Sequence, residues 1–183
     1  KLELLAAAQT RFEPARRVTL RQPDFAPLLG PQPSLTRYST VEQGTGAYLG
    51  VNYGNLRFSG SYTDSLASMF TFNAGEGRLQ RGFMNLGHTF KPAARWEMSL
   101  DLTHTVNRLG MGDFPYVRRA GSDTVAEWTN IITLGSRDRV TAGALFNYVE
   151  GSEWFAPAAQ GERVANGFRR AGAFYAQFEH RFN

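Results

Sequence analysis

The chain of 183 residues contains no cysteine. A disulfide framework, a thiolate metal site and a cysteine nucleophile are therefore excluded. Long hydrophobic runs are also missing, because no stretch of about 18 apolar residues occurs, and this excludes a transmembrane helix. The first residues, KLELLAAA, lack the basic start, apolar region and cleavage site of a secretory signal. We expect either that a signal has been removed or that the sequence is an internal segment.

Lysine is nearly absent, since only Lys1 and Lys91 occur, so the net charge of +4 comes from arginine. The arginines are dispersed along the chain and form no basic patch, which argues against a nucleic-acid partner. Two pairs, Arg118-Arg119 and Arg169-Arg170, fall in or beside predicted loops. They are either solvated loop charges or partners for the phosphates of outer-leaflet lipid, including lipopolysaccharide.

Apolar and polar residues alternate with period two in several segments. The clearest is 96–107, WEMSLDLTHTVN, in which apolar residues and His104 take the even positions and polar residues take the odd ones. The segment 170–183 alternates similarly over a length that suits one tilted crossing of a bilayer. Mean hydropathy is only −0.35, as expected when every second residue of a strand faces lipid. We therefore expect even-numbered residues to face lipid and odd-numbered residues to face a lumen.

Further strands are predicted by the same pattern, which is less clear in 2–12 and in 124–134. They cover 2–12, 45–53, 56–63, 79–90, 124–134 and 139–148, and Val18 and Leu20 mark another. This count gives nine crossings, which does not suit a bacterial single-chain barrel with both termini on one side. Either 2–12 is a short helix, leaving eight strands, or the chain is a piece of a larger barrel.

The predicted connections alternate in length. Short ones at 54–55, 91–95 and 135–138 alternate with long ones at 64–78, 108–123 and 151–169, and a Pro-rich loop is predicted at 23–33. Outer-membrane barrels have short periplasmic turns and long extracellular loops. The predicted fold is an all-β, antiparallel, up-and-down transmembrane barrel of about eight strands, or a contiguous segment of a larger one. It forms one domain over 1–183, in which 1–44 is the least regular part, and a soluble β-sandwich is the alternative fold.

Two stretches resemble the barrel of TonB-dependent outer-membrane receptors. They are 81–105, RGFMNLGHTFKPAARWEMSLDLTHT, and 173–183, AFYAQFEHRFN, and the resemblance extends over about 45–183. It implies a location in the bacterial outer membrane and uptake of a nutrient such as a metal chelate or cobamide. The family has an N-terminal plug and a barrel of about 22 strands, neither of which fits in this length. The resemblance therefore implies an excerpt, a split receptor with a separate plug or barrel chain, or a reduced relative.

Aromatic and arginine residues in the two long C-terminal loops are the predicted ligand contacts. These are Phe114, Tyr116, Arg118, Trp154 and Phe155. A complete small barrel with a structural, adhesive or partner-binding role is the alternative function. Its barrel would be closed and would have eight strands.

Catalysis and cofactor binding are not expected. The histidines, His88, His104 and His180, all take even positions, and no Gly-x-Ser-x-Gly motif occurs. His104 is the one candidate general base for an outer-membrane hydrolase. No metal site is predicted, because the histidines lack close partners on the same face in sequence. Charged residues at odd positions are predicted to line a hydrated lumen: Glu97, Asp101, Glu127, Arg139, Glu179 and Arg181.

Overall fold

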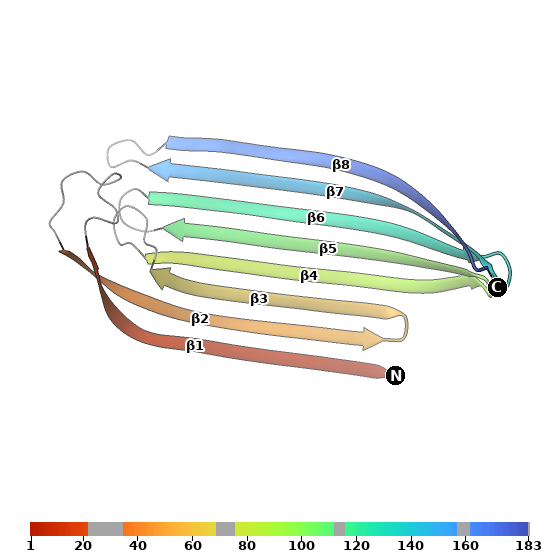
Figure 1. Ribbon diagram of the computed structural model, residues 1–183, viewed down its shortest axis with the longest axis horizontal. Helices are drawn as coiled ribbons and strands as arrows, with labels where there is room; N and C mark the ends of the chain where they lie inside the picture. Colours follow the sequence, from red (N-terminus) through yellow and green to blue (C-terminus); the bar gives the residue numbers. More distant parts are fainter. Residues whose placement is uncertain (22–34, 69–75, 112–115, 157–161, 183) are drawn as a thin grey trace.

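The computed structural model describes residues 1–21, 35–68, 76–111, 116–156 and 162–182, with side chains described for 1–13, 42–66, 77–111, 117–154 and 165–182. Eight antiparallel strands form one sheet in simple sequence order, and the described residues contain no helix (Figure 1). The strands are β1 (Leu2–Arg21), β2 (Leu35–Tyr53), β3 (Leu56–Ser68), β4 (Glu76–Ala93), β5 (Trp96–Met111), β6 (Tyr116–Thr133), β7 (Asp138–Ala156) and β8 (Glu162–His180). The predicted up-and-down, all-β fold of eight strands is confirmed. The sheet is open, because β1 and β8 lie at its two opposite margins (Figure 1).

The strand count resolves the uncertainty at the beginning of the chain. The segment 2–12 is neither a helix nor a separate crossing, and Val18 and Leu20 continue the same strand β1. The pairing of β1 with β2 shifts register between Glu13 and Arg16, so one irregularity interrupts an otherwise continuous ladder. The predicted loop at 23–33 lies outside the described residues.

The predicted long loops are wrong over most of their length. Strand β5 continues to Met111 and β6 begins at Tyr116, while β7 continues to Ala156 and β8 begins at Glu162. The alternation of apolar residues stops earlier than the strands do, but ladder hydrogen bonds involve only the backbone and continue through polar positions. At this end, which we call the hairpin end, the strands therefore extend as hairpins beyond their apolar residues.

The opposite end of the sheet, which we call the turn end, has tight connections. Gly54 adopts the left-handed conformation, with φ of 58°, in the two-residue turn between β2 and β3. This turn also hydrogen-bonds to the next strand, where the Thr89 amide donates to the Asn55 carbonyl at 3.0 Å. Likewise the Thr133 amide donates to the Arg95 carbonyl at 2.8 Å. The predicted difference in connection length between the two ends of the sheet is therefore found, although most of each predicted long loop is part of a β-hairpin.

The two faces of the sheet differ in chemistry. Directly opposed residues of antiparallel strands share a face, and the register places the even positions of β3–β8 on one face. The predicted parity is wrong for β2, because its two-residue turn pairs Tyr53 with Leu56, so odd positions of β2 share that face. We call this face, which includes the even positions of β1 from Leu2 to Phe12, the apolar face, and the other the polar face.

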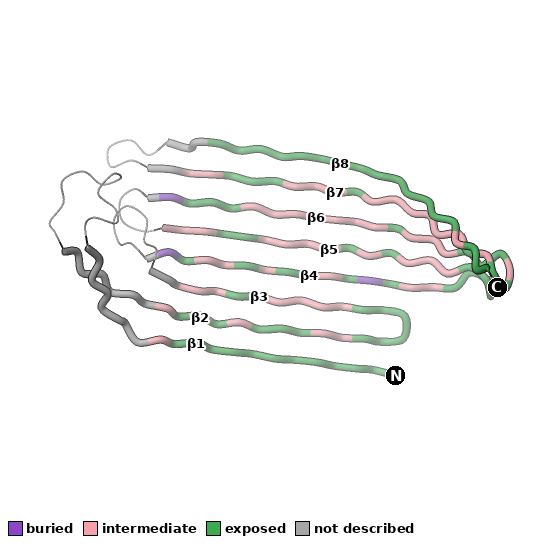
Figure 2. Tube along the Cα trace, in the orientation of Figure 1, coloured by how far each residue is buried: buried purple, intermediate pink, exposed green. Residues whose placement is uncertain are grey.

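Most large side chains of the apolar face are exposed. Among the described residues Val117 is the one buried hydrophobic side chain, at 6% exposure, whereas Phe174 is 90% exposed. Exposure is greatest along the margins β1 and β8 and lower in the central strands (Figure 2). A sheet normally buries its apolar face against a second layer, and the described residues supply none. We call the central part of the apolar face the apolar band, whose members are exposed except for the half-buried Val51 and Phe58: Leu2, Leu4, Leu49, Val51, Tyr53, Leu56, Phe58, Met84, Leu86, Leu100, Leu102, Trp128, Ile132, Phe146, Phe174 and Phe178.

The apolar band runs obliquely to the strands. One row of directly paired residues crosses the sheet from β3 to β8. On β3 the row passes through Gly60, which lies between the apolar residues Phe58 and Tyr62, so there it is inside the band. On β6–β8 the same row consists of Thr124, Tyr148 and Arg170, so there the band has ended. At the turn end the paired row Trp96, Ile132, Val140 and Phe178 is still apolar but has no member on β3. The band is therefore displaced toward the turn end from β3 to β8. In a barrel wall the strands are tilted, so a membrane layer of constant height crosses them obliquely in the same way.

Candidate functional site

The predicted ligand contacts gather at the hairpin end of β6 and β7. Arg118 lies directly opposite Trp154 in the register, and the backbone of Tyr116 lies opposite Ala156, next to Phe155. Phe114 lies outside the described residues, as do the side chains of Tyr116 and Phe155. The structure thus brings four of the five residues to one end of two adjacent strands. Their role in ligand binding stays a prediction.

The polar face carries interactions that cross strands. Arg57 Nη2 donates to Asp101 Oδ1 at 3.2 Å across Gly87, whose missing side chain leaves room for the pair. The pair is more than a third exposed on the arginine side, so its contribution to stability is small. Asn85 Nδ2 donates to Thr103 Oγ1 at 2.9 Å nearby. Asp101 is thus paired across strands on the polar face, and its place in a lumen wall stays a prediction.

A second polar network lies on the same face of β6–β8. Tyr175 donates its hydroxyl to Glu127 Oε1 at 2.9 Å, and the same hydroxyl lies 2.6 Å from Thr129 Oγ1. The Tyr175 ring lies over Gly143 of β7, where a Cβ atom would come within 2.5 Å of the ring. The glycine therefore allows an aromatic side chain to lie flat across the sheet and to reach a carboxylate two strands away.

The turn end of the polar face is hollowed and charged. A depression of about 370 Å³ there is lined by Lys91, Arg95, Glu97, Arg139, Glu179 and Arg181, among others. Lys91 Nζ pairs with Glu97 Oε2 at 3.2 Å. Four residues predicted to line a lumen, Glu97, Arg139, Glu179 and Arg181, therefore lie around one depression.

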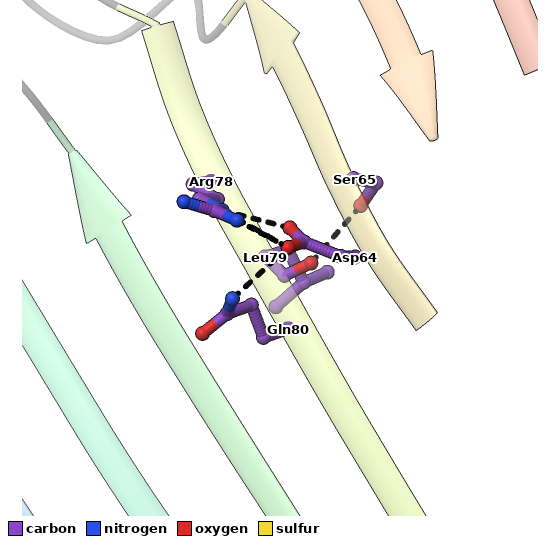
Figure 3. A network of polar contacts seen from close by, with 5 residues as sticks. All are labelled: Asp64, Ser65, Arg78, Leu79 and Gln80. Carbon is purple, nitrogen blue, oxygen red and sulfur yellow. Dashed lines mark hydrogen bonds and ion pairs between the residues drawn. The ribbon is translucent and has the colours of Figure 1, made fainter. Parts of the chain in front are cut away.

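An ion-pair cluster joins β3 and β4 beyond the apolar band, at the hairpin end (Figure 3). Arg78 Nε donates to Asp64 Oδ1 at 2.8 Å, and Gln80 Nε2 donates to Asp64 Oδ2 at 3.0 Å. The Arg78 guanidinium, followed by the Gln80 amide, lowers the pKa of the Asp64 carboxyl from 3.8 to about 2. Asp64 therefore stays ionised at every pH above about 3. The stabilisation from this pair is fully present only above the ordinary carboxyl pKa of 3.8, and it is lost progressively as the pH falls from there through about 2.

A groove of about 640 Å³ lies on the apolar face of β5–β8, where the apolar band ends. His104, Arg108, Ser122, Tyr148, Glu150 and Phe168 are among its lining residues. Glu150 accepts hydrogen bonds from the hydroxyls of Ser122 and Tyr148, both at 3.1 Å. Arg170 lies against two aromatic rings, with its guanidinium carbon 5.6 Å from the Tyr148 centroid and 5.4 Å from the Phe168 centroid. Alternation within single strands did not predict this cluster, because its members come from four strands.

His104 has a contact that does not resemble a catalytic arrangement. Its Nδ1 atom lies 2.8 Å from Thr124 Oγ1, and within the described ranges no hydrogen bond joins it to a carboxylate. His180 does contact one, with Nδ1 at 2.7 Å from Asp138 Oδ1, but at the opposite end of the sheet. Among all the residues that the structure describes, no three histidine, aspartate or glutamate residues are grouped so that they could hold a metal ion.

No helix among the described residues is long and apolar enough to span a membrane. Comparison of the chain with protein-family models, with curated proteins and with solved structures gives no match.

Proposed function

We propose that the chain forms part of the wall of a transmembrane β-barrel in the bacterial outer membrane. The observation that carries this proposal is the combination of a single-layer sheet with a broad exposed apolar band on one face and paired polar groups on the other. Lipid would cover the apolar band and a hydrated lumen would contact the polar face. The oblique course of the band supports the same arrangement, since strands in a barrel are tilted.

The orientation follows from the two ends of the sheet. Tight turns at 54–55, 94–95 and 134–137 would face the periplasm, and the hairpins that extend beyond the apolar band would face the outside. Lipid and lipopolysaccharide would then be the immediate surroundings of the hairpin end.

Within this class we propose a TonB-dependent receptor that takes up a small nutrient. The support is the resemblance of residues 81–105 and 173–183 to such receptors, together with the gathering of Arg118, Trp154 and the backbone of Tyr116 at the hairpin end. An arginine beside a tryptophan suits an anionic or aromatic nutrient such as a metal chelate. A separate plug or further barrel strands would complete such a receptor.

The absence of cysteine allows a direct test of which face contacts lipid. Single-cysteine variants Leu100→Cys and Leu102→Cys would report on the apolar band, and their neighbours Ser99→Cys and Thr103→Cys would report on the polar face. After reconstitution in lipid vesicles, a water-soluble maleimide should label the second pair and should label the first pair only after detergent is added. Equal labelling of all four variants in vesicles would overturn the membrane proposal.

The receptor role has its own experiment. Tryptophan fluorescence of the reconstituted protein would be titrated with ferric citrate and with cyanocobalamin. We expect a saturable change with one of them, which Trp154→Phe abolishes and Trp96→Phe, at the turn end, retains. If neither titration saturates while the cysteine variants still label alternately, the uptake role fails and the membrane wall stands.

A further inference from the structure

Two cationic groups at the groove on β5–β8 lack a counter-ion among the described residues: Arg108, which lines the groove, and Arg170, which lies against two of its lining rings. Among the described residues, neither Arg108 nor Arg170 forms an ion pair, and Arg170 is held by the rings of Tyr148 and Phe168 alone. A guanidinium that lies over aromatic rings keeps its N–H edges free to donate hydrogen bonds. Arg108 lines the groove from β5, on the other side from Arg170.

Glu150 is the one carboxylate among the residues that line the groove. Its carboxylate accepts hydrogen bonds from Ser122 and Tyr148, and the second bond holds the Tyr148 ring where Arg170 contacts it. With histidine neutral, one carboxylate against two guanidinium groups leaves this part of the face with positive charge. The arrangement favours a ligand with more than one negative oxygen.

An apolar depression beside the groove indicates what kind of anionic ligand would fit. Toward the turn end it borders a depression of about 630 Å³ with almost wholly apolar walls, which include Phe146, Gly172 and Phe174. A molecule in both depressions would place an anionic head against the arginines and hydrocarbon against the phenylalanines. Phosphorylated lipids of a membrane leaflet have this construction.

We propose that the groove binds the phosphorylated headgroup of an outer-leaflet lipid, with Arg108 and Arg170 donating hydrogen bonds to its phosphates. The inference rests on the proposed position in the outer membrane and assigns to it a specific lipid site. Arginine suits this role because its planar group can donate two parallel hydrogen bonds to a phosphate. The acyl chains would follow the apolar band from Phe146 toward Phe174.

The test uses lipid A added to the detergent-solubilised protein, with bound lipid counted by native mass spectrometry. We expect wild-type protein to retain lipid A, and each of Arg108→Gln and Arg170→Gln to weaken binding about tenfold or more. Arg81→Gln is the matched control, because Arg81 is an exposed arginine on the polar face of β4, and it should bind as wild type does.

Two further arms separate lipid from other ligands. Dephosphorylated lipid A should bind weakly, and equal binding would overturn the role of the arginines. Inorganic phosphate at millimolar concentration should not displace lipid A, and full displacement would show a phosphate site that needs no lipid. The vesicle labelling of the cysteine variants distinguishes the two failures: alternate labelling with no arginine effect refutes only the lipid site, whereas uniform labelling refutes the membrane proposal itself.

Discussion

Gly143 is the residue at which backbone geometry and side-chain packing are most closely connected. An added Cβ atom would clash with the Trp128 carbonyl oxygen and come within 2.5 Å of the Tyr175 ring. Because one of these neighbours is backbone, rotation of Tyr175 cannot relieve the clash. We expect Gly143→Ala to lower the free energy of unfolding by about 1 to 3 kcal/mol.

Gly172→Ala is the matched control for this substitution, since the nearest atom to its added Cβ would be the Leu145 carbonyl oxygen at 3.7 Å. Urea unfolding of the protein in lipid vesicles, followed by tryptophan fluorescence, would measure both variants. A Gly143→Ala variant as stable as Gly172→Ala would mean that the sheet relaxes around the new methyl group and that the contact with Tyr175 is adjustable.

Leu100 provides the residue-scale test of the apolar band. It is 49% exposed in the centre of the band, while adjacent Ser99 lies on the polar face. In a membrane wall, Leu100→Arg should cost about 2 to 4 kcal/mol near mid-bilayer, because the charge enters hydrocarbon, and Ser99→Arg should cost much less. The same vesicle unfolding experiment compares the two variants, and equal costs would contradict the face assignment.

At the scale of the elements, the hairpin β2–β3 depends on the left-handed conformation of Gly54. A side chain at φ of 58° meets its own backbone, so Gly54→Ala should lower the free energy of unfolding by roughly 1 to 2 kcal/mol. Gly135→Ala is a suitable control, because Gly135 lies in another short turn, without a positive φ and with no atom within 4 Å of its added Cβ. Comparable losses in the two variants would show that the effect does not come from φ.

The elements also show what alternation along a sequence can predict. It predicted strands β3–β8, because one-sided exposure to an apolar surface imposes period two. It placed the turn at 54–55 correctly, and it placed the turns at 94–95 and 134–137 to within a few residues, at 91–95 and 135–138. It misplaced the strand ends at Asn107 and Thr124, since a ladder continues through polar residues once its hairpin is formed, and β5 and β6 extend to Met111 and Tyr116. It also misassigned the faces of β2, because the parity change arises in the turn at Gly54 and not in the strand.

The candidate sites were less predictable than the strands. Arg118 and Trp154 were selected one by one as loop residues, and the register then placed them opposite each other. The cluster of Arg170 with Tyr148 and Phe168 depends on how β7 pairs with β8. Register between strands is not encoded in the pattern of either strand alone, so such contacts require the folded sheet.

At the scale of the whole molecule, the two margins of the sheet need partners. Strands β1 and β8, of 20 and 19 residues, each pair on one side only within the described residues. A row of unpaired backbone groups is unfavourable in hydrocarbon, where each unsatisfied group costs several kcal/mol. In a membrane these margins must therefore pair with each other, with further strands or with another chain.

The positions of the margins favour partners other than each other. Because β1 and β8 lie at opposite sides of the open sheet (Figure 1), we expect an Ala7→Cys/Ala173→Cys protein in vesicles to form no intramolecular crosslink with a short bismaleimide. Ala7→Cys/Tyr48→Cys is the positive control, since these residues are direct partners of β1 and β2 and lie on the polar face, as the tested pair does. Mobility on a denaturing gel, combined with the mass of the product, distinguishes a crosslink within one chain from one between two chains. An efficient intramolecular crosslink would contradict the expectation and favour a closed barrel of eight strands, whereas a crosslink between two chains would identify a second copy as the partner of the margins.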